Sequence, residues 1–472
     1  MVGSSRTLGA DRVDSHSPRS IVAVVLVIAT SALSACGSGV SHPKAGPPTS
    51  AAAQSTSADK ALGNGVSAKA IRLGVALVDF TAIQPYTDLI RTKAEQKQIY
   101  EIYIDNINAH GGINGRKIVP YFRFYTPLGT ASILSLCTSF AEDDNVFAVL
   151  GSFIDFSGDA QTCIANQQHR VLMTFNLTQA IIDRSPPGLI VTPGDIPERQ
   201  AAILIDLLGK EHTLKGKTVA VLGDATESSV VRGTIVPGLE RIGVKPASTA
   251  ILDVDTNGDT TAGQTELDSF IEKWKTERVD ALFLSGDLAP TKAFVVKIKQ
   301  AFPNMLLMAD NGDVGDQAVQ EQKAGVRPNP YEGVYTAGGL SAQAYDRSPN
   351  WKYCASIYRA ATGKVAPDAE HTITLSNGKI DDTYGTINDA CQVVSMFHDI
   401  AERVGPSLNN INWVNTVNHF GPIANRGSGP YSSLHTGKYA ADDNWLLERW
   451  DSSLGTFGLS KPVTPLEDVT GT

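Results

Sequence analysis

The sequence contains no excess of basic residues. Lysine and arginine number 40 against 49 aspartates and glutamates, which gives a formal net charge of -9 at pH 7. A nucleic-acid-binding surface needs positive charge to neutralise phosphates, so nucleic acid is excluded as a partner. A charged content of 19% and a hydrophobic content of 42% are instead typical of a soluble globular protein. A length of 472 residues predicts two or more lobes rather than one core.

The sequence also lacks the common catalytic motifs. It contains no G-x-S-x-G or H-E-x-x-H segment, and its nine histidines show no metal-ligand spacing. Gly216-Lys217-Thr218 resembles the end of a phosphate-binding P-loop, but Glu211 stands where the motif requires its first glycine, and the segment precedes a strand. We therefore expect neither catalysis nor a cofactor nor a metal.

One partial metal motif remains. The segment from Asp253 to Asp259 places oxygen side chains at alternate positions before a glycine, as in the first half of an EF-hand calcium loop. Position twelve is Gln264 instead of a bidentate glutamate, and position eight is Thr260 instead of an aliphatic residue. A polar strand-to-helix loop is the favoured interpretation, and calcium binding is the alternative.

No apolar run is long enough to span a bilayer comfortably. The uncharged run Ile21 to Ala32 follows Arg19 and suits the core of a signal peptide. The tetrapeptide Leu33 to Cys36 resembles the bacterial lipobox, in which Cys36 receives a lipid and becomes the first mature residue. A plain secretory signal is the alternative. The stretch Gly37 to Ser67 has almost no large apolar residue and is expected to be a flexible tether.

Cysteine is scarce, with five residues in the chain. If Cys36 carries a lipid, an even number remains, and in an exported protein these are expected to form disulfides. Cys137 and Cys163 lie in neighbouring expected helices and are predicted to pair. Cys354 and Cys391 lie in the later helical stretches Trp351 to Ala361 and Thr386 to Arg403 and are predicted to pair with each other.

From Ile71 onward, short buried strands alternate with amphipathic helices. The strand-like runs are bounded by turn residues and have no polar face, as expected for parallel strands covered on both sides: Ile71 to Val78, Val146 to Leu150, Val171 to Phe175, Thr218 to Leu222, Ala281 to Leu284 and Met305 to Met308. The order predicts an α/β fold of two doubly wound parallel-sheet lobes with a ligand cleft between them.

The stretch Ile104 to Ile118 carries the most specific pattern. The helical stripe Gln96, Ile99, Tyr100, Tyr103 and Ile107 stops at a double glycine, and an Asn-Gly turn then leads into a β-rich run. The combination Asn-x-x-Gly-Gly-Ile-x-Gly-Arg resembles the class I periplasmic binding proteins of the leucine/isoleucine/valine-binding branch. The residues that carry the resemblance are Asn108, Gly111, Gly112, Ile113, Gly115 and Arg116. The resemblance extends from about Ala70 and weakens beyond Gly339.

The resemblance implies that loops at the carboxyl ends of the strands hold the solute. In that family the first lobe binds the ligand's carboxylate through hydroxyls and backbone N–H groups, and the nearest positions here are Ser157, Thr178 and Gln179. A helix N-cap is the alternative role for the Ser and the Thr. Tyr86, after the first strand, is expected to form a wall of the site, and a solvent-exposed aromatic in a loop is the alternative.

The second lobe contributes the facing loops. Asp224 and Asp287 are candidates because they follow the carboxyl ends of expected strands. Ser228 stands where the family often has Tyr-Gly. Asn311 stands where amino-acid binders often carry an acid for the ammonium group. These departures from the family pattern weaken the inference that this chain binds an amino acid.

The expected organisation is a signal peptide (1–35), a lipid-anchored tether (36–67), lobe 1 (68–192 and 333–440), lobe 2 (193–332) and a C-terminal segment returning toward lobe 2 (441–472). The implied function is a monomeric lipoprotein at the outer face of a bacterial membrane that binds a small polar solute and delivers it to ABC permease subunits. A ligand sensor of the same fold and a secreted α/β enzyme are the alternatives.

Overall fold

The computed structural model describes residues 61–84, 89–127, 130–153, 158–252, 261–288, 291–312, 314–338, 345–368, 373–375, 379–459 and 464–465. The predicted signal peptide, Cys36 and the EF-hand-like segment Asp253 to Asp259 lie outside these residues. Within the described part of the chain, no helix combines the length and the apolar character needed to cross a membrane.

Lobe 1 is built on a five-stranded parallel sheet with the strand order β3-β1-β4-β5-β6. Its strands are β1 (Ala70–Val78), β3 (Lys117–Tyr125), β4 (Ala148–Gly151), β5 (Val171–Thr174) and β6 (Ile190–Val191). Every residue of β4 and β5 is buried, as their continuous apolar character predicts for central strands. The carboxyl ends of β1, β4 and β5 therefore meet at one edge of the sheet, where the candidate loops begin.

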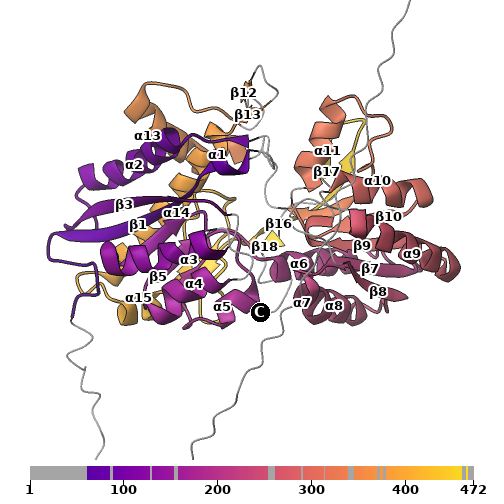
Figure 1. Cartoon of the computed structure of the whole chain (residues 1–472), viewed down its shortest axis with the longest axis horizontal. Coiled ribbons are helices and arrows are strands. Elements are labelled where there is room, and N and C mark those ends of the chain that lie inside the picture. Colours follow the sequence, from indigo (N-terminus) through magenta and orange to yellow (C-terminus); the bar gives the residue numbers. More distant parts are fainter. Residues whose placement is uncertain are drawn as a thin grey trace, which may run out of the picture. The chain divides into compact units, whose positions relative to one another are not determined.

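The helices of lobe 1 come from two separate parts of the chain. The first part supplies α1 (Phe80–Ile83), α2 (Lys93–Ala109), α3 (Thr130–Thr138), α4 (Asp159–Thr162) and α5 (Gln179–Asp183), with π-helical turns η2 (Ser139–Asp143) and η3 (Cys163–Gln167). The second part supplies α13 (Pro349–Thr362), α14 (Thr383–Val404) and α15 (Asn410–Asn418). Helices α13 and α14 pack against α2 and against each other (Figure 1). One hydrophobic core thus joins both parts.

The double-glycine stretch ends α2 as predicted. Gly112 has a φ of 74°, and a Cβ there would lie 2.0 Å from the carbonyl oxygen of Arg116, so only glycine fits. The Asn108 side chain both donates to and accepts from the backbone of Ile118, at 2.9 and 2.7 Å. Arg116 donates to the carbonyl oxygens of Ser67 and Pro406, at 2.9 and 2.6 Å. The motif residues therefore join helix, strand and the second part of lobe 1.

Both predicted disulfides are confirmed. Cys137–Cys163 joins α3 to η3, with the Cα atoms 6.1 Å apart. Cys354–Cys391 joins α13 to α14, with the Cα atoms 5.8 Å apart. All four cysteines are buried, so each bond lies within the core of lobe 1.

Lobe 2 is built on a second sheet with the order β17-β16-β11-β10-β9-β7-β8, and β18 pairs with β16. The parallel strands are β7 (Val219–Asp224), β8 (Ser248–Leu252), β9 (Ala281–Ser285), β10 (Leu306–Ala309) and β11 (Tyr335–Gly338). The strands β16 (Asn444–Asp451), β17 (Thr456–Leu459) and β18 (Thr464–Pro465) extend it as an antiparallel edge. The structure thus places β11, just beyond residue 332, in the second sheet.

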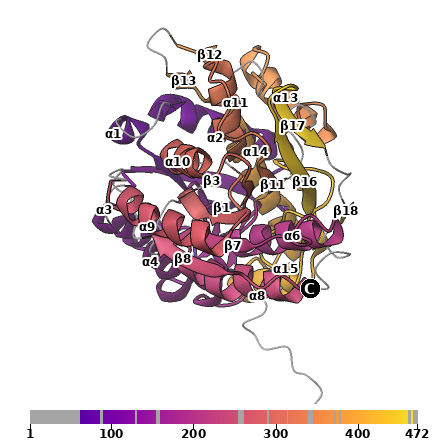
Figure 2. The ribbon, with the colours of Figure 1, turned by 90° about the vertical axis from the view of Figure 1, so that its right-hand side faces the viewer.

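The helices of lobe 2 follow the predicted alternation. They are α6 (Pro197–Lys210), α7 (Ser228–Val230), α8 (Val236–Arg241), α9 (Thr261–Glu277), α10 (Lys292–Ala301) and α11 (Val314–Lys323), with the short turns η4 (Val231–Ile235) and η5 (Gly286–Leu288). Helix α6 packs against β11 and β16 (Figure 2). Leu204 of α6 shares a core with Ala337 and Leu447.

The remaining strands form two small sheets. One contains β2 (Leu89–Ile90), β12 (Ile373–Thr374) and β13 (Ile380–Asp381), and the other contains β14 (Gly421–Pro422) and β15 (Ser433–Leu434). At the start of the described chain, the Gly63 N–H donates to Leu408 O at 2.9 Å, and Val66 forms a β-bridge with Ile71. This end of the expected tether is therefore part of the folded body.

Two of the segments that run between the lobes are hydrogen-bonded to each other. Thr192, directly after β6, donates to Tyr439 O at 2.9 Å and accepts from the Ala441 N–H at 2.9 Å. The Asp442 N–H donates to Gly194 O at 3.4 Å. We call 192–194 together with 439–442 the crossing ribbon. It fixes the point at which the chain passes from one sheet to the other.

Candidate functional site

The strand-end loops of lobe 2 converge on Gly286. Asp310, directly after β10, accepts hydrogen bonds from Ser285 Oγ at 2.7 Å and from the Gly286 N–H at 3.1 Å. Asn311 donates its side-chain amide to Gly286 O at 3.4 Å. A Cβ on Gly286 would lie 2.3 Å from Oδ2 of Asp224, at the end of β7. The structure therefore brings two predicted residues, Asp224 and Asn311, to one point.

The carboxyls of this cluster are buried. Asp224 is 4% exposed and Asp310 is 3% exposed. Burial raises the pKa of Asp310 to about 7; the hydrogen bond from Ser285 lowers it, and the nearby Asp224 raises it further. Asp310 is thus a central group of this cluster.

The other predicted residues of lobe 2 lie in adjacent turns. Ser228 is half-buried and begins α7, four positions after Asp224. Asp287 lies in η5, directly after Gly286. Both turns follow strand ends, as predicted. Each is close in sequence to a residue of the Gly286 cluster.

The strand-end loops of lobe 1 carry hydroxyl and aromatic groups. Thr174 Oγ1, at the end of β5, accepts from the Phe153 N–H at 2.9 Å and donates to Gly151 O at 2.7 Å. Tyr125 donates to Ser152 O at 2.9 Å and stacks on Phe153, with the ring centroids 5.9 Å apart. These contacts tie the loop after β4 to the ends of β3 and β5.

Thr178 and Gln179 lie at the start of α5. Thr178 is the N-cap residue, and its hydroxyl accepts from the Ile181 N–H at 3.2 Å. Gln179 donates its side-chain amide to Asp183 at 2.7 Å. Thr178 therefore caps α5, which was the alternative role expected from the sequence. A contact between Thr178 and a solute remains a prediction. Tyr86 and Ser157 lie outside the described residues.

A polar cluster that sequence reasoning missed lies beside the crossing ribbon. Asp443 accepts from Arg199 at 3.0 Å and from Lys438 at 2.9 Å. Within the part of the chain that the structure describes, no side chain donates a hydrogen bond to the buried Asp195 carboxyl, and the backbone N–H of Ile196 lies beside it. Burial raises the pKa of Asp195 to about 8, although Arg199 lowers it. The only sequence signal was an acid placed between a strand and the Pro that begins α6.

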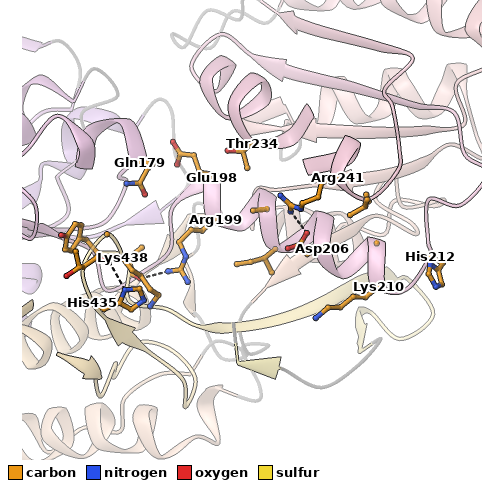
Figure 3. Close-up of a pocket in the computed structure, with 18 residues that line it drawn as sticks. Gln179, Glu198, Arg199, Asp206, Lys210, His212, Thr234, Arg241, His435 and Lys438 are labelled. Atoms are coloured by element: carbon orange, nitrogen blue, oxygen red, sulfur yellow. Dashed lines mark hydrogen bonds and ion pairs between the residues drawn. The ribbon is translucent and has the colours of Figure 1, made fainter. Parts of the chain in front are cut away.

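A cavity of about 1160 Å³ opens next to this cluster, between α6 and the segment 435–440 (Figure 3). Of the predicted site residues that the structure describes, only Gln179 lines it. Glu198 and Arg199, from the first turn of α6, also line it. The cavity therefore borders the start of α5 but does not contain the Gly286 cluster.

Glu198 faces Gln179 across one end of this cavity (Figure 3). Burial raises the pKa of the Glu198 carboxyl, and the backbone N–H groups of Gln179 and Ala180 act against that increase. Among the described residues, its buried Oε2 atom has no hydrogen-bond partner. The amides at the start of α5 thus face a carboxyl from α6. No group of metal-ligating side chains occurs among the described residues.

Comparison with solved structures identifies the fold. The branched-chain amino acid transporter substrate-binding protein LivJ from Streptococcus pneumoniae, in complex with isoleucine, is 16% identical; the match covers 84% of this chain and 100% of that chain, with a TM-score of 0.55. A fatty acid ABC transporter substrate-binding protein from Thermomonospora curvata is 17% identical, with coverages of 87% and 96% and a TM-score of 0.57.

A third similar structure is a solute-binding protein of an ABC transporter from Rhodopseudomonas palustris, in complex with 3,4-dihydroxybenzoic acid. It is 14% identical, with coverages of 85% and 99% and a TM-score of 0.56. No protein-family model and no curated protein matches the sequence. The predicted fold, two lobes with parallel sheets as in the class I periplasmic binding proteins, is confirmed, and each match spans nearly the whole of the solved chain.

Proposed function

We propose that this chain is the extracytoplasmic solute-binding lipoprotein of an ABC importer. The observation that carries the proposal is the two-lobed fold, which is similar over more than four fifths of the chain to substrate-binding proteins of ABC transporters. In this role a small polar solute binds between the strand-end loops of the two lobes, the lobes close about the crossing ribbon, and the permease recognises the closed form. The protein acts as a monomer and catalyses no reaction.

The solute class is open to experiment because the similar structures bind different molecules. One binds isoleucine, another is named for fatty acids, and a third binds 3,4-dihydroxybenzoic acid. A thermal-shift screen of residues 37–472 against amino acids, amides, short peptides, polyols, amines and aromatic acids tests the proposal. We expect at least one class to raise the melting temperature. Turnover of a bound compound would instead support an enzyme.

A sensor that presents its bound solute to a signalling partner is the second candidate of the same fold. Neighbouring genes for a permease and an ATPase, together with uptake that is lost on deletion of this gene, support the importer. Normal uptake in the deletion strain would contradict it.

The membrane anchor rests on the lipobox-like Leu33 to Cys36. We expect Cys36→Ala to release the folded body from the membrane fraction, because the following stretch to Ser67 has almost no large apolar residue to hold it there. Fractionation after a high-salt wash measures this, and a variant that stayed in the membrane fraction would contradict lipid attachment.

A further inference from the structure

The first turn of α6 is the boundary between the hydrophobic cores of the two lobes. Ile196, directly before the helix, belongs to the core of lobe 1, whereas Ala201 belongs to a core of lobe 2. In the later crossing segment the boundary lies between Ala441 and Trp445. The residues between these positions belong to neither core. A rotation of one lobe relative to the other therefore disturbs the least apolar packing if it occurs there.

Consecutive polar side chains of this turn reach different elements. Arg199 donates to Ala440 O at 2.6 Å and pairs with Asp443 at 3.0 Å. Gln200 donates to Ala337 O, in β11, at 3.3 Å. Arg199 therefore connects α6 to the crossing segment that adjoins lobe 1, while Gln200 connects the same helix to the sheet of lobe 2.

Glu198 reaches lobe 1 at a second place. Its carboxyl faces Gln179 (Figure 3), and the backbone N–H groups of Gln179 and Ala180 lie beside it. The next two residues of α5, Ile181 and Ile182, belong to the core of lobe 1. The first N–H groups of a helix have no acceptor within that helix, so a carboxylate from α6 stabilises them. Glu198 thus connects lobe 2 to a helix of lobe 1.

The two contacts point in different directions. Successive residues of an α-helix project about 100° apart around its axis. Glu198 and Arg199 therefore hold α6 from two sides, one toward α5 and the other toward the segment 440–443. A rotation of α6 relative to lobe 1 that preserved one of these contacts would stretch the other.

The two contacts differ in strength. Asp443 is 5% exposed and also accepts from Lys438 at 2.9 Å, so Arg199 binds a buried, ionised partner. Glu198 lines an open cavity and is repelled by Asp183 of α5. The Glu198 contact is therefore the weaker of the two and the first to break when α6 moves.

We propose that Glu198 and Arg199 form a clamp that holds α6 against lobe 1 and keeps the two lobes in the arrangement of this structure. The clamp is a conformational device distinct from solute recognition, and its consequence for solute capture rests on the proposed closure of the lobes. A solute that closes the lobes has to supply the free energy that releases the Glu198 contact. Its apparent affinity therefore depends on the strength of the clamp.

Distances between spin labels test the clamp without any solute. Asp105 of α2 and Glu272 of α9 are exposed positions in lobe 1 and lobe 2. In the protein that begins at residue 37, every native cysteine is in a disulfide. Asp105→Cys and Glu272→Cys therefore supply the only thiols to label, and double electron–electron resonance gives the distribution of distances between the lobes.

Glu198→Ala removes the weaker contact, and Asp206→Ala is its matched control. Asp206 lies on the same helix, but its carboxylate accepts from Arg241 of α8, so its loss leaves the contacts with lobe 1 in place. We expect Glu198→Ala to populate a second distance about tenfold more than the unchanged protein does, as for a lost hydrogen bond to a charged group. Asp206→Ala should give the distribution of the unchanged protein. Arg199→Gln should enlarge the change, and Glu198→Ala alone decides if that variant does not fold.

Hydrogen exchange tests the Glu198 contact itself. The N–H groups of Gln179 and Ala180 should exchange about tenfold faster in Glu198→Ala and at unchanged rates in Asp206→Ala. Unchanged exchange in Glu198→Ala would mean that the contact does not form. Faster exchange or a lower melting temperature with an unchanged distance distribution would mean that Glu198 only stabilises the fold. Each of these results overturns the clamp.

Failure of the clamp and failure of the solute-binding function give different results. The distance measurement needs no solute, so it decides the clamp even if the thermal-shift screen finds no compound. If a solute is found and Glu198→Ala keeps the distance distribution of the unchanged protein, the solute-binding function stands and the clamp is wrong.

Discussion

The two lobes share one architecture but are stabilised by different means. Lobe 1 contains both disulfides, each between helices that cover its sheet. Lobe 2 contains no cysteine, and its sheet is instead widened by β16 and β17 from the C-terminal part of the chain. Their strand ends differ as well: Thr174 and Phe153 in lobe 1 are neutral, whereas Asp224 and Asp310 in lobe 2 are carboxyls. Similar folds are therefore stabilised by disulfides in lobe 1 and without them in lobe 2, and the end of β5 differs in charge from the ends of β7 and β10.

The largest expected effect comes from removing the disulfides. Replacing Cys354 and Cys391 by alanine should lower the free energy of unfolding by about 2 to 4 kcal/mol, and the Cys137/Cys163 pair should behave similarly, because each bond restricts the unfolded chain. Hydrogen exchange on the double variants measures where protection is lost. We expect faster exchange in lobe 1 and unchanged exchange in β7, β9 and β10. Equal losses of exchange protection in both lobes would show that the disulfides do not stabilise lobe 1 selectively.

A matched pair of glycines tests the acidic cluster of lobe 2. Gly286→Ala introduces a Cβ at a φ of 73° and only 2.3 Å from the Asp224 carboxylate. Gly216→Ala has a similar φ of 75° but no atom within 4 Å of the new Cβ. We expect Gly216→Ala to lower the free energy of unfolding by about 1 kcal/mol and Gly286→Ala by about 2 kcal/mol more. Urea denaturation measures both, and equal effects would mean that the packing around Gly286 is loose.

The pH dependence of stability gives a smaller effect. The folded-state pKa of Asp310 is about 7, above its ordinary value of 3.8. The folded protein therefore binds more protons than the unfolded chain between these values, and its stability falls as the pH rises from about 4 to 7. Asp310→Asn should remove most of that decrease, because the asparagine side chain does not titrate. Urea titrations of both proteins at pH 4 and pH 7.5 check this; parallel profiles would contradict it.

The smallest effect concerns Thr178 in lobe 1. Loss of the hydrogen bond from the Ile181 N–H should lower the stability of Thr178→Ala by about 1 kcal/mol. If the hydroxyl also binds solute, affinity falls roughly tenfold or more. Thermal unfolding of the ligand-free variant and its affinity for an identified solute separate the two roles. Unchanged affinity would remove Thr178 from the site and weaken the assignment of Gln179.

Elements that depend on local pattern were predictable from the sequence. The buried strands β1, β4, β5, β7, β9 and β10 and the glycine-terminated helix α2 follow from apolar runs and turn residues. The N-cap role of Thr178 likewise follows from its residue type. These features are encoded within short stretches, so no knowledge of distant contacts was needed.

Features that depend on distant contacts were not predictable. The sequence predicted that residues 441–472 return toward lobe 2, but not that β16 pairs with β11, more than 100 residues earlier in the sequence. Lys438 and Asp442, which are distant in sequence, act on the pKa of Asp195, and the cavity beside α6 is lined by the distant residues 435–440. Residue spacing carries no record of such packing, which explains why the candidate list omitted Asp195 and Glu198.

The crossing ribbon has a mechanical consequence. Two backbone segments hydrogen-bonded edge to edge resist shearing past one another, since sliding would break the bonds of Thr192 with Tyr439 and Ala441 together. Bending the pair as one sheet leaves those bonds intact. The ion pair of Arg199 with Asp443 further attaches one end of the pair to α6. If the lobes close as we propose, the crossing ribbon therefore favours rotation about a single axis, which would return the loops of one sheet to the same positions opposite the other.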